Sequence, residues 1–529
     1  MPQAEYVPLS TRDDDDNDAA HFEPQHRRRR AGFRLGSARA RTAIGLVGLV
    51  LAFASLVGLG WTHYGGSSSA LHDVVNDMDQ GGGGSSGDAD PDPEPTHPDD
   101  DLGEIGDNPY FQKGDTWQHN LEVIKRLERC EELGFLVDTH DPSAPRRGVA
   151  QEAEAAMEGC GWNETTVVIL ASYWLADAVG GTDNTGETVY AQSTISTLQA
   201  NGYAVLYSSL GWLNHDMRRT TEYYQRWHKN VRLVLADPEQ IDVCFDKDQA
   251  DGQKCLKTED NLDGIPAWKL LAWWYWDDPG TPLGPGFTLS PANTNANHFL
   301  SFSIEPSCKR LPYVTHAERK KPDQAYVLAK QVHYLGPQAS EKYGRFTWTL
   351  DAFTSIKAEL NVSFAGGFVN DEKETLKAVL DAGIINYGPL NKVQFYTQLA
   401  ESFVLVGVGQ PRISPSPWDA LCQGVPFINP ILSWDENDPT DRKAWRLQQW
   451  HMVNLDPPYV YSVRADDLVG LHNAVGNALT HPIDSYIPDN MKFDWVTNRM
   501  AEVVEGDWRG KGEEVLEQWK EEGKALFVM

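Results

Sequence analysis

One segment, Phe403 to Pro430, contains residues whose types and spacing suit phosphate binding; it reads FVLVGVGQPRISPSPWDALCQGVPFINP. Its first six residues are continuously apolar and rich in β-branched side chains. That composition predicts a parallel strand covered on both faces. Gly407, within this run, and Gly409, just after it, allow the backbone to turn tightly and to approach a ligand closely.

A short helix is predicted after this turn. Ser416 is positioned to cap it, Pro417 to begin it and Gly424 to end it. Free backbone N–H groups at a helix start beyond a strand suit an anionic phosphate. The alternative is an ordinary strand-to-helix turn in which Asp419 only closes a capping box.

The residue pattern of the segment resembles the nucleotide-sugar signature of the inverting glycosyltransferases of family 18, the N-acetylglucosaminyltransferase V family. That signature joins a Gly-x-Gly turn, a Pro-x-Pro helix start, an acid and Phe-Leu-Asn-Pro. Here the acid is Asp419 instead of the family's Glu, and residues 427–430 read FINP. The similarity extends with gaps from about Thr165 to about Val503. It implies two Rossmann-like lobes, the GT-B architecture, and metal-independent transfer from UDP-GlcNAc.

The resemblance also implies a catalytic base. The acid of a Gly-Glu pair has this role in the family, and the matching residue is Glu187, which opens a predicted helix ending before Gly202. A helix N-terminus stabilises a carboxylate. The alternative is an acidic residue with no role beyond the first turn of its helix.

Three further residues match donor-binding positions of the family. Lys330 ends the strand YVLAK and would neutralise the departing diphosphate, unless it is only a solvated strand-end lysine. Glu305, at the end of FLSFSIE, matches a donor-site Glu. Asp419 would accept hydrogen bonds from ribose or sugar hydroxyls. With Gly407, Gly409 and Ser416, these residues form the predicted donor site.

The elements that position these residues alternate between strand and helix. Strands are expected at 165–171, 203–207, 326–330, 362–365 and 403–408, and helices at 187–200, 350–360, 390–401, 465–480 and 491–505. Such alternation predicts α/β lobes with parallel sheets. The first, acceptor lobe is assigned to residues 108–295, and the nucleotide-sugar lobe with its closing helices to residues 296–529.

Two other patterns have the composition of a binding site. The aromatic residues of 268–276 would form either a sugar-stacking platform or a core strand, and the core is favoured. Asp246 and Asp248 have the spacing of a metal-binding Asp-x-Asp pair, but they lie in a polar loop bracketed by cysteines. No catalytic metal and no cofactor besides the UDP-sugar is predicted.

The N-terminus predicts a membrane anchor. Thr42 to Trp61 is an uncharged apolar run, long enough for a helix to cross a hydrocarbon core of ~30 Å. Seven arginines between residues 27 and 41 precede it, which places residues 1–41 in the cytosol. The expected layout is a cytoplasmic tail (1–41), a signal anchor (42–62), an acidic stem (63–107) and a lumenal head. A cleaved signal peptide is the alternative.

The cysteines and sequons fit a lumenal head. Pairing is plausible for Cys130 with Cys160 and for Cys244 with Cys255, whereas Cys422 is expected to be an unpaired core thiol. Asn163 and Asn361 begin Asn-x-Ser/Thr sequons and are candidate glycosylation sites.

A net charge of -30 argues against a nucleic-acid partner. The sequence therefore predicts a single-pass type II Golgi membrane enzyme that forms a β1,6-linked GlcNAc branch on a mannose of a glycoprotein N-glycan. The alternatives are a transferase with another nucleotide sugar or a glycolipid acceptor, a catalytically silent glycan-binding protein, and a glycoside hydrolase with two facing carboxylates.

Overall fold

The computed structural model describes residues that all lie in one compact unit, Leu102–Met529. The described residues are 111, 114–139, 147–180, 185–209, 216–246, 254–276, 281–292, 297–311, 313–336, 347–370, 372–524 and 526–529. The predicted tail, anchor and stem lie outside them. Within the described residues, no helix has the length and apolarity needed to cross a membrane.

The first sheet has six parallel strands in the order β2-β1-β3-β4-β5-β6. The strands are β1 (Val167–Leu170), β2 (Ala204–Tyr207), β3 (Val231–Ala236), β4 (Leu270–Trp273), β5 (Thr288–Ser290) and β6 (His298–Phe299). All four residues of β1 are buried, as expected for a strand covered on both faces. Helix α6 (Gly186–Ala200) connects β1 to β2 after α5 (Tyr173–Gly180).

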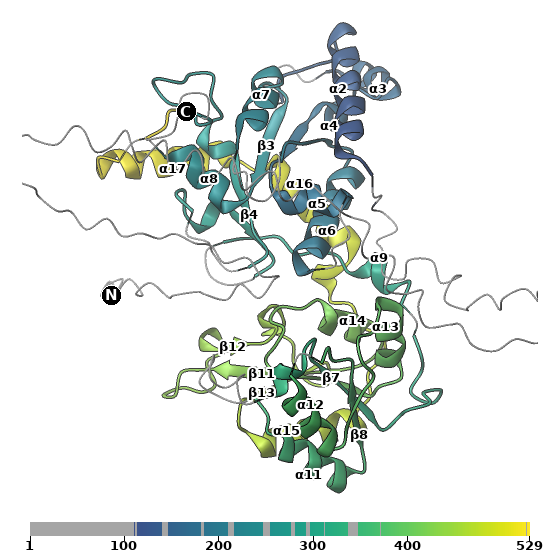
Figure 1. Ribbon diagram of the computed structural model, residues 1–529. Helices are drawn as coiled ribbons and strands as arrows, with labels where there is room; N and C mark the ends of the chain where they lie inside the picture. Colours follow the sequence, from purple (N-terminus) through teal and green to yellow (C-terminus); the bar gives the residue numbers. More distant parts are fainter. Residues whose placement is uncertain are drawn as a thin grey trace, which may run out of the picture. The chain divides into compact units, whose positions relative to one another are not determined.

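The second sheet has seven strands, with β10 near its centre. The strands are β7 (Gln324–Leu328), β8 (Ser363–Gly366), β9 (Ile384–Asn386), β10 (Val404–Gly407), β11 (Phe427–Ser433), β12 (Arg446–Leu447) and β13 (Val460–Arg464). Only β12 runs antiparallel to its neighbour. The helices are α11 (Leu350–Leu360), α12 (Lys373–Asp381), α13 (Lys392–Ala400), α14 (Ser416–Cys422) and α15 (Leu468–Thr480). Figure 1 shows α11, α12 and α15 beside these strands.

The parallel first sheet and the mostly parallel second sheet confirm the α/β prediction. The helix expected at residues 350–360 is found with those bounds, and the other predicted elements shift by one to three residues at their ends. Such shifts are usual, because helix and strand ends fray.

The boundary between the two halves differs from the predicted one. β6 lies after residue 295 but pairs with β5 in the first sheet. The last two helices, α16 (Phe493–Glu505) and α17 (Trp508–Glu521), were assigned to the second lobe, yet α16 packs on α6 and β3 and α17 on residues 267–269. Figure 1 shows both helices, in yellow, among the elements of the first sheet. The chain therefore returns to its first half after completing the second.

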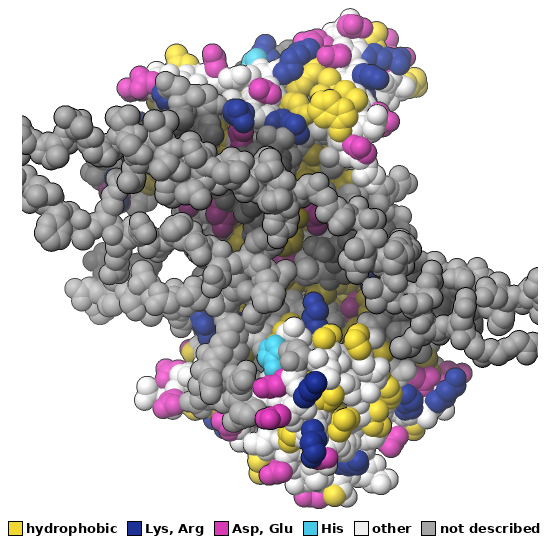
Figure 2. All heavy atoms as spheres, viewed as in Figure 1, with side chains coloured by type: hydrophobic (Ala, Val, Ile, Leu, Met, Phe, Trp, Pro, Cys, Tyr) yellow, Lys and Arg dark blue, Asp and Glu magenta, His cyan; other side chains and the backbone are white. Residues whose placement is uncertain are grey.

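Three disulfides join the six cysteines. Cys130–Cys160 and Cys244–Cys255 are bonded as expected. The prediction for Cys422 was wrong, because it is bonded to Cys308. On the face shown in Figure 2, acidic and basic side chains are interspersed over the described surface.

Candidate functional site

Glu187 lies in the first turn of α6, where Thr185 caps the helix by accepting the Thr188 N–H. The Glu187 residue is only 4% exposed. Burial raises the pKa of the carboxyl group, and hydrogen bonds from its own N–H, Thr185 and Trp276 oppose this shift. A carboxylate whose pKa is raised toward neutrality suits a general base.

Two aromatic residues after β4 hold the start of α6. Trp276 donates its indole N–H to the Glu187 carboxylate at 3.0 Å. The ring of Tyr275 packs on Gly186 so closely that a Cβ there would lie 2.4 Å from it. The Gly-Glu pair therefore has a structural explanation, because the glycine admits the ring beside the acid.

Tyr275 also reaches the predicted donor turn between β10 and α14. Its hydroxyl donates to the Ile413 carbonyl at 2.8 Å. The structure thus brings Glu187 and the donor turn together through Tyr275 and Trp276. A second path runs through Trp450, whose ring centroid is 6.2 Å from that of Trp276.

The donor turn is held by the side chain of Gln448. Its carbonyl accepts the Gly409 N–H at 2.9 Å and its amide donates to the Pro411 carbonyl at 3.1 Å. Gly409 has a φ of 93°, in the region that favours glycine. A Cβ on Gly407 would lie 2.3 Å from the Gln448 side chain. The structure therefore explains both glycines by the protein's own packing, and a role in ligand approach stays a prediction.

The start of α14 differs from the prediction. Pro415, not Ser416, is the N-cap residue, and Ser416 is the first residue of the helix. Ser414 instead accepts the Ser416 N–H, while the N–H groups of Trp418 and Asp419 bond to the Pro415 carbonyl. Pro417 has no N–H. The first-turn amides expected to bind phosphate are thus engaged within the chain. Gly424 does end the helix region, with a φ of 67°.

Asp419 is placed one residue too far along α14 to close a capping box. Its carboxylate accepts a hydrogen bond from the Tyr396 hydroxyl at 3.3 Å. Burial raises its pKa to about 7, against the lowering effects of Lys392 and Tyr396. A role of Asp419 in binding sugar or ribose hydroxyls stays a prediction.

Lys330 and Glu305 have different surroundings. β7 pairs with β10 so that Leu328 lies opposite Gly407. Lys330, two residues beyond Leu328, is exposed at the C-terminal ends of these strands, where the donor turn also begins. Glu305 lies in α9 (Glu305–Cys308), accepts the Phe493 N–H at 2.8 Å and pairs with Lys309 at 2.8 Å. These contacts lower its pKa and tie it to the start of α16, so a role in donor binding stays a prediction.

The aromatic run belongs mainly to the core, as favoured. Trp268, Trp273 and Tyr275 are buried, and the Trp273 ring stacks on Tyr190 at 4.5 Å. Trp276 is only partly buried and is the member that contacts Glu187. The sequence did not predict this contact with Glu187, because Trp276 belongs to a run that was assigned to the core.

His451 is a second residue beside the site that no sequence motif selects. Its ring lies 5.4 Å from that of Tyr275, and burial lowers its pKa to about 3, which keeps it neutral. Both ring nitrogens are buried without a hydrogen-bond partner among the described residues.

The sequons differ in exposure. Asn163 donates its side-chain amide to the Asn201 carbonyl at 2.7 Å, and Thr165 is fully buried. Asn361 is exposed, in the left-handed conformation that ends α11.

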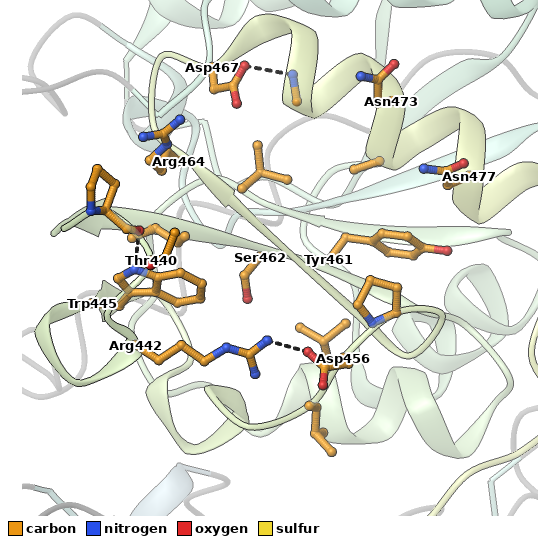
Figure 3. A pocket seen from close by; sticks show the side chains of 18 residues that line it. Thr440, Arg442, Trp445, Asp456, Tyr461, Ser462, Arg464, Asp467, Asn473 and Asn477 are labelled. Atoms are coloured by element: carbon orange, nitrogen blue, oxygen red, sulfur yellow. Dashed lines mark hydrogen bonds and ion pairs between the residues drawn. The ribbon is translucent and has the colours of Figure 1, made fainter.

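Two cavities lie apart from the predicted residues. One of about 450 Å³, shown in Figure 3, is formed by β13, α15 and the segment before β12, with an Arg442–Asp456 ion pair at its wall. Another of about 710 Å³ lies beside the Cys244–Cys255 loop. Within the described part of the chain, no group of three His, Cys, Asp or Glu side chains is arranged to hold a metal.

Comparison with known proteins identifies a family in the second half. Residues 286–509 match the family model described as Glycosyltransferase family 18. Alpha-1,6-mannosylglycoprotein 6-beta-N-acetylglucosaminyltransferase A of Cricetulus griseus is 25% identical over 129 residues, which cover 23% of this chain and 17% of that protein. The Homo sapiens protein of the same name is 24% identical with the same coverage. The match thus spans less than a fifth of these relatives' length.

Solved structures with a similar course of the chain have low sequence identity. UDP-GlcNAc 2-epimerase from Methanocaldococcus jannaschii is 10% identical, with a TM-score of 0.36 over 64% of this chain and 99% of that one. AviGT4, a glycosyltransferase of avilamycin A biosynthesis, is 12% identical, with a TM-score of 0.33 over 67% and 97%.

The family match includes the donor turn, α14 and Trp450, whereas Glu187 and Trp276 precede it. Residues 286–509 thus match the family that the sequence pattern resembles, glycosyltransferase family 18.

Proposed function

We propose that this chain is an inverting glycosyltransferase of GT-B architecture. It transfers N-acetylglucosamine from UDP-GlcNAc to a mannose hydroxyl of an N-glycan and forms a β1,6 branch. The family domain supports glycosyl transfer. The name of the curated relatives supports this donor sugar, acceptor and linkage.

The observation that carries the proposal is the placement of Glu187. A buried carboxylate with a raised pKa, oriented by Trp276, is joined through Tyr275 to the donor turn of the family domain. This arrangement supports a base and a donor site that act on one substrate pair.

The reaction follows from these roles. Glu187 accepts the proton of the acceptor hydroxyl while the oxygen of that hydroxyl forms a bond to the anomeric carbon of the donor sugar. The bond from that carbon to the diphosphate oxygen breaks on the opposite face, so the configuration inverts. UDP departs with the bonding electron pair. Lys330, just after the C-terminal end of β7, neutralises part of the negative charge of the UDP.

We also propose that the enzyme needs no metal and that it is a single-pass type II protein of the Golgi membrane. The apolar run Thr42–Trp61, with arginines before it, supports the topology. The metal-independent reaction rests on the family resemblance.

The test is to incubate the purified full chain with UDP-GlcNAc and a mannose-terminated N-glycan, with and without a chelator. We expect a β1,6-linked GlcNAc in the product, identified by nuclear magnetic resonance, and equal rates in both samples. UDP-glucose and UDP-GalNAc serve as donor controls, and a glycolipid as acceptor control. A product only from one of those controls would assign another donor or acceptor, and donor binding without any product would favour a silent glycan-binding protein.

A further inference from the structure

Several backbone N–H groups of the donor turn are not free to bind a negatively charged diphosphate. The N–H groups of Gly409, Ser416 and Trp418 are bonded within the chain. A diphosphate beside this turn therefore depends on side-chain cations for much of its stabilisation.

Arg412 is a cation on the turn itself. Its neighbours on both sides are fixed, because Gln448 binds the Pro411 carbonyl and the Ile413 N–H bonds to the Gln448 carbonyl at 2.8 Å. Ile413 has a φ of 46°, which is unusual for a β-branched residue. Backbone contacts from two directions thus hold a strained turn in one conformation and set where the Arg412 side chain begins.

The side chain of Arg412 is oriented by Trp450. The guanidinium carbon lies 4.9 Å from the centroid of the Trp450 ring. Stacking on an aromatic ring limits the conformations that a guanidinium must lose when it binds a phosphate. Arg412 is only partly buried, so a ligand can reach it.

The same tryptophan connects Arg412 to the predicted base. Trp450 contacts Trp276, and Trp276 donates to Glu187. The base and the cation are therefore separated by two packed rings. Inverting transfer requires the base and the leaving group on opposite sides of the anomeric carbon, and this separation suits that requirement.

We propose that Arg412 binds the diphosphate of the nucleotide-sugar donor and stabilises the departing UDP, with Trp450 as its positioning residue. Lys330, at the same sheet edge, is then one of two cations for the diphosphate. This inference rests on the proposed function and assigns a donor-binding residue that the sequence did not select.

The test measures binding of UDP and of uridine to the purified full chain by calorimetry. Arg412→Met should weaken UDP binding at least tenfold, yet change uridine binding less than twofold, because uridine has no phosphate. Arg412→Lys should keep part of the UDP affinity. Trp450→Leu should also weaken UDP more than uridine.

The control is Arg226→Met. Arg226 likewise lies over a tryptophan, with its guanidinium carbon 3.9 Å from the centroid of the Trp227 ring. It is the last residue of α7 (Arg218–Arg226) and precedes the N-terminal end of β3, whereas Glu187 follows the C-terminal end of β1. Its UDP affinity should equal that of the wild type.

The outcomes separate the two proposals. If the wild type binds UDP and transfers sugar while Arg412→Met binds UDP equally well, only the role of Arg412 is overturned. A parallel loss of UDP and uridine binding would also overturn it, because it would indicate damage to the nucleoside site. If the wild type does not bind UDP, the proposed function fails and the inference with it.

Discussion

The Trp276 indole donates a hydrogen bond to the Glu187 carboxylate at 3.0 Å, and this contact joins the end of β4 to the start of α6. It gives the buried acid a fixed orientation and opposes the rise in its pKa that burial causes. A residue that follows β4 thus lowers the pKa of the proposed base in α6.

Glu187→Gln should abolish turnover while donor binding persists. A general base typically contributes about 10²–10⁴-fold, so kcat should fall by at least that factor. The control is Asp351→Asn, which removes an exposed carboxylate from the first turn of α11 and should leave kcat unchanged. Normal turnover of Glu187→Gln would leave Glu187 a buried residue of the helix start without catalytic role.

The same substitution should change how stability depends on pH. Because the folded-state pKa of Glu187 is raised above its ordinary value of 4.5, the unfolded chain ionises first, and wild-type stability falls as the pH rises from 4.5 through the folded pKa. Gln at this position does not titrate. The melting temperature of Glu187→Gln relative to the wild type should therefore be higher at pH 7 than at pH 4. An equal difference at both pH values would contradict the raised pKa.

Trp276→Phe should move the pH profile of the enzyme. Without the indole N–H the ionised carboxylate loses a donor, the pKa of Glu187 rises further, and the acidic limb of kcat/KM should shift to higher pH. Trp274→Phe, two residues earlier in the same aromatic run, is the control and should leave the limb in place. An unshifted limb in Trp276→Phe would separate the hydrogen bond from catalysis.

Gly186→Ala should displace the Tyr275 ring. The new Cβ would lie 2.4 Å from that ring, so the hydrogen bond from Tyr275 to Ile413 should be lost. We expect a loss of stability of about 1–3 kcal/mol, typical of overpacking, measured by chemical denaturation. Gly476→Ala in α15 is the control, because its Cβ would make only ordinary contacts at 3.8 Å with Leu360 and should be neutral or stabilising. Equal stabilities of the two variants would show that Tyr275 can move without cost.

Local patterns predicted the elements well but not their partners. The apolar run 403–408 and the helix 350–360 were found because periodicity and burial are visible in a short window. The Cys308–Cys422 bond joins residues 114 apart, and α16 packs on α6 and β3 although it follows the second sheet in the chain. These features depend on the tertiary arrangement, which the residue pattern does not contain.

The candidate site shows the same limit. Glu187 was selected from a motif, whereas the aromatic run was classed as core because its alternating positions suit a core strand. Tyr275 is buried as expected, but the contact of Trp276 with Glu187 was missed. The predicted Ser416 cap was wrong because the helix begins one residue earlier: Pro415 is the N-cap residue, and the Trp418 N–H bonds to its carbonyl.

The two sequons should differ in use. Asn361 is exposed at the end of α11, whereas the Asn163 amide is bonded to Asn201 and Thr165 is fully buried. If the head is lumenal, the full chain expressed in a secretory cell should carry an N-glycan at Asn361, and endoglycosidase treatment should increase its electrophoretic mobility by one step. Asn361→Gln should abolish that step. Asn163→Gln should leave that step and lower stability by about 0.5–1.5 kcal/mol through the lost hydrogen bond. Loss of the step only in Asn163→Gln would contradict the exposure seen in the structure, and a wild type without any step would count against the lumenal topology.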